Sequence, residues 1–382
     1  MTRLASVVIP AYRSATLRAT LESLLADDQE AIATEVIVVL NDASAEVRQI
    51  AQQFAPEVRL VEMPVNLGVA GAFNHGFGLS KGDYLVQMQD DATVEPGWLD
   101  LLVEAVDSAP DVGGAGALKI NHRGEVRDAG WVIWRDGSTT PALVDGDLDP
   151  DHYRVQRGVD YHGSVGMVYR RAAWESVGGL DDSFYPAYYG DTDFCCRLRA
   201  RGWRVLLEPR ARVHHSGGSS TSSNYRIFLS ARNRLTFLDR HQHSIAGHGE
   251  YSDRPSDLTR EVERAASSLA GPRPQPATAD ELKLLRERIE LQPEVVLRRE
   301  RDTLAAFAGA LTEQLGEAQQ AALSSAEQLA DSEQARIETE RQLLETTLRL
   351  EEAETSLEQI RLSRSWRWTA VLRRTAALLR NR

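Results

Sequence analysis

Short apolar runs rich in β-branched residues alternate with amphipathic stretches over the first 120 residues. Runs of the first kind predict strands, and apolar residues spaced three and four apart predict helices. The predicted strands cover Ser6 to Ile9, Glu35 to Leu40, Val58 to Val61, Tyr84 to Met88 and Val112 to Leu118, and the predicted helices cover Ala15 to Ala26, Ala45 to Phe54, Ala70 to Leu79 and Gly97 to Asp107. This alternation predicts an α/β fold with a mostly parallel twisted sheet and helices on both faces.

Small, polar and acidic residues follow directly after four of these strands. They are Pro10-Ala11-Tyr12, Asn41-Asp42, Pro64 to Gly68, and Gln89-Asp90-Asp91. Ligands of such sheets bind beyond the carboxyl ends of the strands. We therefore expect a nucleotide to lie along this edge.

Two further clusters of acidic or imidazole side chains occur about a hundred residues later. Asp191 and Asp193 lie in YYGDTDFCC, and His214 and His215 lie in RVHHSGG. Carboxylates and imidazoles gathered at strand ends are what a metal-dependent transfer of a phosphate-activated group requires.

Composition narrows the class of protein. With 382 residues, 42% of them hydrophobic, the chain exceeds one ordinary domain, so we expect a second module. A formal net charge of −12 argues against a nucleic-acid binder. The two cysteines, Cys195 and Cys196, are adjacent and cannot build a disulfide framework, which favours a reducing compartment. The sequence has no apolar run of about 18 residues and no signal-like start, so we expect a cytoplasmic location.

Six motifs in order give the chain a specific resemblance. They are VVIPAYRS, VVLNDAS, NLGVAGAFNHG, QDDATVEPGWL, the stretch from GGLDDSFY to VHHSGGSS, and RNRLTF. From Ser6 to His241 the chain resembles the family 2 glycosyltransferases with the GT-A fold, most closely the bacterial branch that adds rhamnose, galactofuranose or related sugars to cell-surface polysaccharides. The resemblance implies inverting transfer from a nucleotide-diphosphate sugar to a hydroxyl of a saccharide or lipid-linked saccharide.

The resemblance also implies a divalent metal site for Mg²⁺ or Mn²⁺. Asp91 matches the metal-binding aspartate of the family's D-x-D element, and Gln89 replaces its first aspartate. Asp90 is expected to contact the ribose or a bound water. His215 matches the histidine that closes over the metal, with His214 as the alternative. The competing interpretation is that the Asp90-Asp91 pair caps the following helix.

On the acceptor side, Asp191 matches the family's catalytic base, which takes the proton from the attacking hydroxyl. Gly190 replaces the glutamate that usually precedes this base. Asp193 is expected to cap the following helix or to pair with Arg197 at i+4. The alternative is a loop of solvated aspartates.

The remaining predicted site residues hold the nucleotide sugar. By resemblance they are Pro10, Ala11, Tyr12, Asp42, Asn66, Gly68, Asn74 and Asp90. The segment NLGVAGAFNHG is equally explained as a packed helix start. Trp131, Trp134 and Trp174 are either a stacking platform for an acceptor sugar or core residues.

Beyond the catalytic domain, predicted for residues 1–241, the pattern changes. Residues 242–280 are rich in Pro, Gly, Ser and charge and predict a linker. Residues 281–360 are predicted to be helical, and an imperfect heptad seam runs from Leu311 through Leu343 to Ile360. The seam favours a coiled-coil homo-oligomer over a single helix or one packed on the catalytic domain. Residues 361–382 hold seven arginines, no acid and two tryptophans, which favours a peripheral contact with the inner face of the cell membrane over pairing with an acidic protein surface.

Two other function classes stay open at this point. A sugar-phosphate nucleotidyltransferase would share the fold but needs a basic, glycine-rich loop after the first strand, where this chain has PAYRS. A catalytically silent scaffold that recruits partners through its helices is compatible with Gln89 and Gly190.

Overall fold

The computed structural model describes residues 3–14, 16–27, 32–143, 149, 153–215, 222–267, 273–289, 293–328 and 333–362, without the side chains of residues 322–340, 361 and 362. These residues form two compact units. The first comprises Met1–Ser220 and Ser230–Leu291, and the second comprises Thr221–Leu229 and Gln292–Arg382. From position 363 onward, the predicted basic tail lies outside the described residues.

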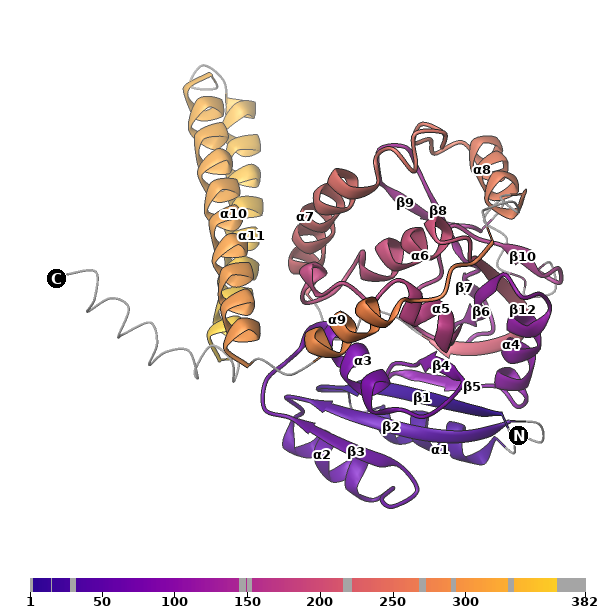
Figure 1. Cartoon of the computed structure of the whole chain (residues 1–382). Coiled ribbons are helices and arrows are strands. Elements are labelled where there is room, and N and C mark those ends of the chain that lie inside the picture. Colours follow the sequence, from indigo (N-terminus) through magenta and orange to yellow (C-terminus); the bar gives the residue numbers. More distant parts are fainter. Residues whose placement is uncertain are drawn as a thin grey trace. The chain divides into compact units, whose positions relative to one another are not determined.

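One large mixed sheet organises the first unit (Figure 1). Its strands are β1 (Leu4–Ala11), β2 (Ala33–Asn41), β3 (Arg59–Met63), β4 (Tyr84–Gln87), β5 (Ala92–Val94), β6 (Val112–Ile120), β7 (Val126–Asp128), β10 (Arg157–Gly158), β11 (Met167–Arg170) and β12 (Arg204–His215). The path through the sheet is β10-β12-β6-β11-β4-β1-β2-β3, with β5 on β12 and β7 on β6.

The predicted βα order of the first 120 residues is confirmed. β3, β2, β1 and β4 are parallel neighbours, and β6 and β12 form a second parallel pair. β11 lies between the two groups and is antiparallel to both β4 and β6. The sheet is therefore mixed rather than mostly parallel. The stretch before β11 returns to the edge at which the parallel strands end, so β11 enters the sheet from that edge and runs in the opposite direction.

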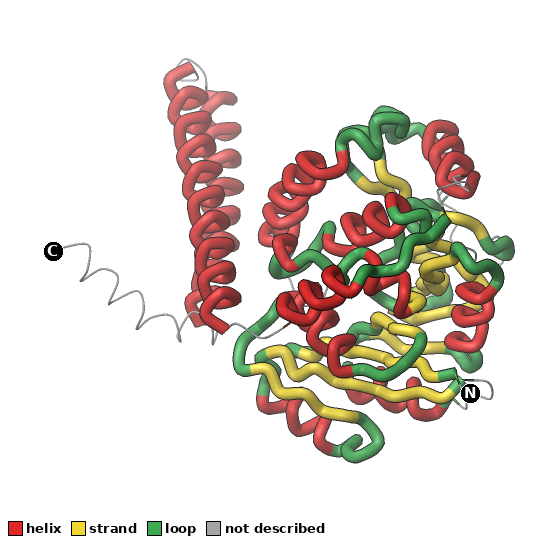
Figure 2. The backbone as a smooth tube through the Cα atoms, in the orientation of Figure 1, coloured by secondary structure: helices red, strands yellow, loops and turns green. Residues whose placement is uncertain are grey.

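Helices cover both faces of the sheet, as Figure 2 shows. They are α1 (Leu17–Ala26), α2 (Ala45–Gln52), α3 (Gly68–Leu79), α4 (Trp98–Asp107), α5 (Arg171–Ser176), α6 (Gly190–Ala200), α8 (Pro255–Ser267) and α9 (Ala279–Ile289). α1 and α4 bury their apolar sides against Val7 and its neighbours on one face. α3 packs on the other, where a β-carbon on Gly76 would lie 2.4 Å from Val8, so only glycine permits this approach.

The stretch between β6 and β11 forms short strands that the sequence pattern did not predict. β8 (Trp131–Ile133) and β9 (Thr139–Pro141) pair as a separate two-stranded sheet. Asp160, fully buried, accepts a hydrogen bond from Ile133 N at 2.9 Å and forms ion pairs with Arg199 of α6 and Arg264 of α8. These pairs fix α8 to the sheet, so part of the predicted linker is a packed helix.

The second unit is helical. α10 (Pro293–Gln328) and α11 (Glu333–Leu362) lie side by side as a hairpin, and the first turns of α7 (Ser223–His241) meet α10 where Tyr225 and Phe307 have ring centroids 4.8 Å apart. From position 293 on, the predicted helical region therefore pairs within one chain instead of forming a single long helix, whereas its first part lies in α9 of the first unit. Leu343, a predicted seam residue, is exposed.

Candidate active site

The carboxyl ends of β1 and β4 are tied together by Asp90. Tyr12 N donates to Asp90 Oδ2 at 3.2 Å, and Ser14 Oγ donates to the Asp90 carbonyl at 3.1 Å. Burial raises the pKa of the Asp90 carboxyl to about 6, against the opposing effect of the Tyr12 hydrogen bond. One carboxylate oxygen of Asp90 thus organises the loop after β1, which carries the predicted nucleotide-binding residues.

Asp91 and His215 come from distant parts of the chain and meet at this edge. β5 pairs antiparallel with the end of β12, where His215 lies opposite Ala92, the residue after Asp91. This pairing leaves His215 Nε2 3.2 Å from Asp91 Oδ1. Both side chains are more than four-fifths buried, and within the described part of the chain His215 Nε2 makes no hydrogen bond of acceptable geometry.

His214 faces away from this pair. Its Nε2 lies 3.2 Å from Glu95 Oε1, as expected where neighbouring residues of a strand point to opposite sides. The structure therefore places His215, and not His214, beside Asp91.

The donor atoms of the pair fit a divalent cation. A carboxylate oxygen and an imidazole nitrogen are both ligands of Mn²⁺, and the carboxylate suits Mg²⁺. Among the described residues no group of three or more His, Cys, Asp or Glu side chains is arranged to hold a metal ion. A cation held by this pair alone would have further coordination positions open to oxygen ligands.

One group of the predicted nucleotide-binding residues lies at the ends of β1 and β2, and the other lies just before and within α3. Tyr12 and Asp42 are half-buried at the ends of β1 and β2, and Ser44 N donates to the Tyr12 carbonyl at 2.9 Å, which joins the two loops. Asp42 has a positive φ of 54°, a conformation that asparagine and aspartate tolerate. Ala11 is completely buried, so its methyl group belongs to the core.

Asn66, Gly68 and Asn74 hold the chain in shape. Asn66 Oδ1 accepts hydrogen bonds from Gly68 N at 2.8 Å and from Asn41 Nδ2 at 3.0 Å. Asn74 is buried, and its amide exchanges two hydrogen bonds with the backbone of Leu180, at 2.8 and 2.9 Å. The structure thus gives Asn74 a packing role and leaves Asn66 at the edge.

Asp191 lies in the first turn of α6. Tyr188 and Tyr189, just before it, have φ of 70° and 65°, and Thr192 N donates to Asp191 Oδ1 at 2.9 Å. The residue is half-buried, and burial raises the pKa of its carboxyl, while the nearby Lys119 ammonium lowers it. A carboxyl in this setting can act as a proton acceptor near neutral pH.

Asp193 has a different environment. It is fully buried, pairs with Arg197 Nε at 2.7 Å and lies 2.8 Å from His241 Nε2. These two partners keep the pKa of its carboxyl below the ordinary value despite burial. The i+4 ion pair expected from the sequence is present, and Asp193 links α6 to α7.

Sequence reasoning missed a buried ion pair beside Asp191. Lys119, at the end of β6, lies 2.6 Å from Asp128 of β7, and both are at most 8% exposed. Trp131 Nε1 also donates to Asp128 Oδ2, at 2.8 Å. The available signal was a lysine closing the apolar strand VGGAGALKI, because a buried lysine needs a charged partner.

Asp91, His215 and Lys119 lie along one edge of the sheet. Lys119 is paired in register with Val213 of β12, two residues before His215. Gln89 Nε2 donates to Ser164 Oγ at 3.2 Å, next to Gly163. A β-carbon on Gly163 would lie 2.9 Å from Lys119 Nζ and 3.6 Å from Asp191 Oδ2. A series of contacting residues therefore connects the surroundings of Asp91 with those of Asp191.

Of the three predicted platform tryptophans, two belong to the core. Trp134 and Trp174 are 1% and 2% exposed. Trp131 is half-buried and stacks on Tyr161, with ring centroids 5.7 Å apart. Of the three, only Trp131 is partly exposed.

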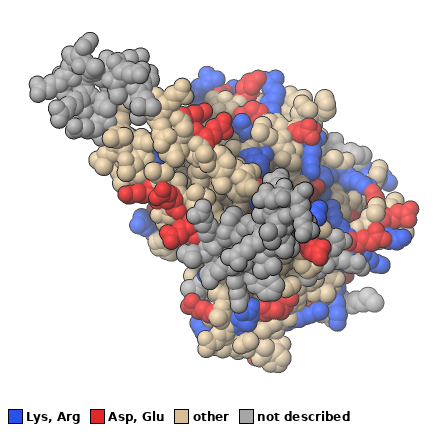
Figure 3. Space-filling model, turned by 90° about the vertical axis from the view of Figure 1, so that its left-hand side faces the viewer, with Lys and Arg blue, Asp and Glu red and all other residues tan. Residues whose placement is uncertain are grey.

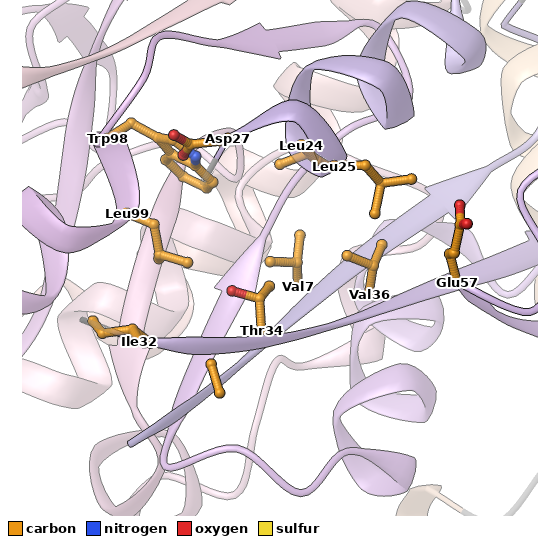
Figure 4. A pocket seen from close by; sticks show the side chains of 11 residues that line it. Val7, Leu24, Leu25, Asp27, Ile32, Thr34, Val36, Glu57, Trp98 and Leu99 are labelled. Carbon is orange, nitrogen blue, oxygen red and sulfur yellow. The ribbon is translucent and has the colours of Figure 1, made fainter. Parts of the chain in front are cut away.

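A cavity elsewhere in the first unit has a different lining. A cavity of about 250 Å³ lies under α1 and α4, lined by Leu24, Trp98 and the start of β2 (Figure 4). It contains none of the predicted site residues. On the face shown in Figure 3, basic and acidic side chains are interspersed. No described helix is long and apolar enough to cross a bilayer.

Comparisons with known proteins identify a family model and several relatives that match this chain. Residues 6–160 match the model of glycosyl transferase family 2. The chain is 28% identical over 255 residues to N-acetylglucosaminyl-diphospho-decaprenol L-rhamnosyltransferase of Mycobacterium tuberculosis, covering 58% of this chain and 80% of that protein. It is 38% identical over 105 residues to the succinoglycan biosynthesis protein ExoO of Rhizobium meliloti, covering 27% and 29%.

Solved structures show a more distant similarity. One is the mannosyltransferase PcManGT from Pyrobaculum calidifontis in complex with GDP-Man and Mn²⁺. It is 17% identical to this chain with a TM-score of 0.46, and the match covers 90% of this chain and 86% of that one.

Proposed function

Residues 6–160 belong to glycosyl transferase family 2, in its bacterial polysaccharide branch, and from this premise we propose the reaction. The protein moves a sugar from a nucleotide-diphosphate donor to a hydroxyl of a saccharide or lipid-linked saccharide, with inversion at the anomeric carbon. The observation that carries the proposal is the Asp91–His215 pair, 3.2 Å apart, at the edge of the sheet where Lys119 lies near the end of β6 and α6 brings Asp191 close to Lys119.

The donor nucleotide lies over the carboxyl ends of β1, β2 and β4. Tyr12 and Asp42 border the base and ribose, and the Asp90 carboxylate holds the Tyr12 loop in place through its backbone hydrogen bond. Asn66 lies at the same edge and borders the nucleotide as well. Asn74 and Ala11 support the pocket from within the fold, because their side chains are buried.

Asp91 and His215 would hold Mg²⁺ or Mn²⁺ at the diphosphate end of the donor. A cation there would supply positive charge that offsets the negative charge developing on the departing diphosphate. Because His215 closes β12 and Asp91 precedes β5, the pairing of these strands sets the distance between the two ligands. Gln89, which replaces the first aspartate of the D-x-D element, donates instead to Ser164.

Asp191 accepts the proton of the attacking hydroxyl as that oxygen bonds to the anomeric carbon. The hydroxyl approaches from the side opposite the diphosphate, which inverts the configuration. Burial raises the pKa of this half-buried carboxyl, and the nearby Lys119 ammonium opposes that shift and so favours the ionised form. General-base assistance of this kind contributes about 10²–10⁴-fold to the rate.

A silent scaffold is the second candidate, and Gly190 is the feature that favours it. The glutamate that the family pattern places there is absent, although a β-carbon on Gly190 would have Phe184 as its nearest neighbour at an ordinary contact distance of 3.9 Å. Hydrolysis or transfer of a nucleotide sugar by the purified protein would exclude the scaffold.

For the rest of the chain we propose that residues 361–382 bring the enzyme to an anionic membrane surface carrying the acceptor, and that the region 281–360 supports homo-oligomers. Arginines near such a surface each add about 1 kcal/mol. Co-sedimentation with anionic vesicles should fall sharply when residues 361–382 are removed. Equal binding by both forms would end the membrane proposal.

The experiment that tests the reaction is a thermal-shift screen of nucleotide-diphosphate sugars with and without Mn²⁺, followed by a hydrolysis assay of each stabilising compound. One donor should raise the melting temperature only with the metal present and should be slowly hydrolysed. If no donor does so, the proposed reaction is wrong.

A further inference from the structure

The carboxyl group of Asp191 faces two charged side chains from neighbouring strands. Lys119 of β6 and Asp128 of β7 form an ion pair at 2.6 Å, and both are at most 8% exposed. The position of a β-carbon on Gly163 serves as a reference point, because Lys119 Nζ, Asp191 Oδ2 and Asp128 Oδ2 all lie within 4 Å of it. Both carboxylates therefore lie close to the same ammonium.

The other titratable groups that face Asp191 are uncharged near neutral pH. They are Tyr161, Tyr169, Tyr189 and Cys195. Burial raises the pKa of the Tyr189 hydroxyl and of the Cys195 thiol to about 12, and it also raises the pKa of the Tyr161 and Tyr169 hydroxyls. In the described part of the chain, the charged side chains that face Asp191 are therefore those of the ion pair from β6 and β7.

Asp128 is held against the ammonium by its own hairpin. Gly130 N donates to Asp128 Oδ1 at 2.8 Å, and Trp131 Nε1 donates to Asp128 Oδ2 at 2.8 Å. Both of its oxygens are therefore fixed, and Oδ2 is the one that contacts Lys119. The pair keeps this geometry whether Asp191 is protonated or ionised.

Two further titratable side chains face Asp128. Burial lowers the pKa of the His162 imidazole, so this ring is uncharged near neutral pH. The guanidinium of Arg157 is held by the Ala129 carbonyl, to which its Nη2 donates at 2.8 Å. Asp128 therefore keeps one cationic neighbour when Lys119 is replaced.

The two members of the ion pair act on Asp191 in opposite directions. Burial raises the pKa of the Asp191 carboxyl, the Lys119 ammonium lowers it, and the Asp128 carboxylate raises it by a smaller amount. A base that is too readily protonated is not ionised when the hydroxyl arrives, whereas one that is too strongly stabilised as a carboxylate accepts the proton poorly.

We propose that Lys119 and Asp128 are positioning residues for the base: Lys119 keeps Asp191 ionised for the incoming hydroxyl, and Asp128 limits this effect so that Asp191 still takes the proton. Each residue acts through Asp191 and is assigned no contact with the reacting atoms. This inference rests on the proposed function, and it adds two residues that belong to none of the sequence motifs.

The test follows the protonation of Asp191 in the full-length protein by NMR, with aspartate isotope-labelled at the carboxyl carbon. In each variant the signal is assigned as the one that an additional Asp191→Asn replacement removes. Lys119→Met should raise the midpoint of its titration by at least about 1 pH unit, and Asp128→Asn should lower it by at least about 1 pH unit. Loss of a merely structural ion pair would not move the two midpoints in opposite directions.

The double variant Lys119→Met/Asp128→Asn leaves no unpaired charge in the cluster, so it provides the test even if a single variant does not fold. Its midpoint should lie above that of the wild type, because Lys119 has the larger effect. The matched control is Asp111→Asn/Arg204→Met, an ion pair of 2.6 Å at the other ends of β6 and β12. It lies roughly 20 Å from Lys119 along the strand, beyond the reach of screened charges, and should leave the midpoint unchanged.

An unchanged midpoint in the double variant, or displacements of the two single variants in the same direction, would overturn the proposal. The titration uses no sugar, so its result is independent of the proposed reaction. If the midpoints move as expected and the thermal-shift screen finds no donor, the reaction is wrong and the ion pair still sets the charge of Asp191. If a donor is found and the midpoints do not move, this inference alone fails.

Discussion

Asn233 of α7 offers a direct test of how the fold holds the proposed base. The residue is completely buried, and its Nδ2 donates to the carbonyls of Phe184, Ala187 and Tyr188 at 3.3, 2.9 and 2.9 Å. Arg232 Nε donates to its Oδ1 at 2.9 Å, which orients the amide. One side chain thus holds the loop that leads into Asp191.

Replacement of Asn233 by leucine keeps the volume and removes the donor. Leaving a buried polar group without its partner costs about 1–3 kcal/mol. Three carbonyls share the lost donor, so we expect the free energy of unfolding to fall by about 2–3 kcal/mol. Because the loop then relaxes away from its left-handed conformations at Tyr188 and Tyr189, Asp191 should shift, and a shift of about 1 Å costs roughly 10²-fold in rate.

Urea unfolding followed by tryptophan fluorescence measures the first effect, and the transfer rate measures the second. Asn224→Leu, on the same helix, is the matched control and should change both by little. A wild-type unfolding midpoint and rate in Asn233→Leu would refute the positioning role assigned to α7.

Three further outcomes are expected. His215→Ala should weaken metal-dependent donor binding at least about 10-fold, whereas His214→Ala should leave it nearly unchanged; calorimetry with Mn²⁺ distinguishes them, and equal losses would contradict the assignment. Burial raises the pKa of Asp191, and only its deprotonated form accepts a proton, so the transfer rate should fall on the acid side at a pH above the ordinary aspartate value; a pH–rate profile that is flat down to that value would be inconsistent with this base. Arg264→Met leaves the buried Asp160 with one guanidinium partner fewer and should destabilise the first unit by about 3 kcal/mol in urea unfolding, a loss that an exposed variant, Arg260→Met, should not reproduce.

The strands and helices before position 120 were predictable because each has one clear period. Apolar runs such as VIVVL are long enough to specify buried parallel strands, and the structure places β2 and its neighbours there. The strands between β6 and β11 were not predictable, since β7, β8 and β9 are three residues each and carry no detectable alternation. Their positions depend on tertiary contacts such as the one between Asp160 and Ile133 N.

Amino-acid composition alone did not predict the helix that follows His241. Its glycines and prolines predict a linker, yet Pro255 occupies the first turn of α8, where proline is favoured. Val262 and Ala265 of this helix are buried, and Arg264 pairs with Asp160. A 13-residue helix with one narrow apolar stripe is a weak signal beside that composition.

The sequence predicted those residues of the candidate site that lie in recognisable motifs. Asp91 and His215 lie 3.2 Å apart although 123 positions separate them in the sequence, and only strand pairing brings them together. Lys119 and Asp128 belong to no motif used in the prediction. Their partnership depends on a hairpin whose register shifts between β6 and β7, which the sequence does not specify.

The most direct measurement compares Asp191→Asn with the wild type in two assays on the same preparation, calorimetric binding of the nucleotide sugar with Mn²⁺ and the rate of sugar transfer. The amide is isosteric with the carboxylate but cannot accept the proton. We predict donor binding within about 2-fold of the wild type and a loss of transfer on the order of 10³-fold. Transfer at the wild-type rate would contradict the account.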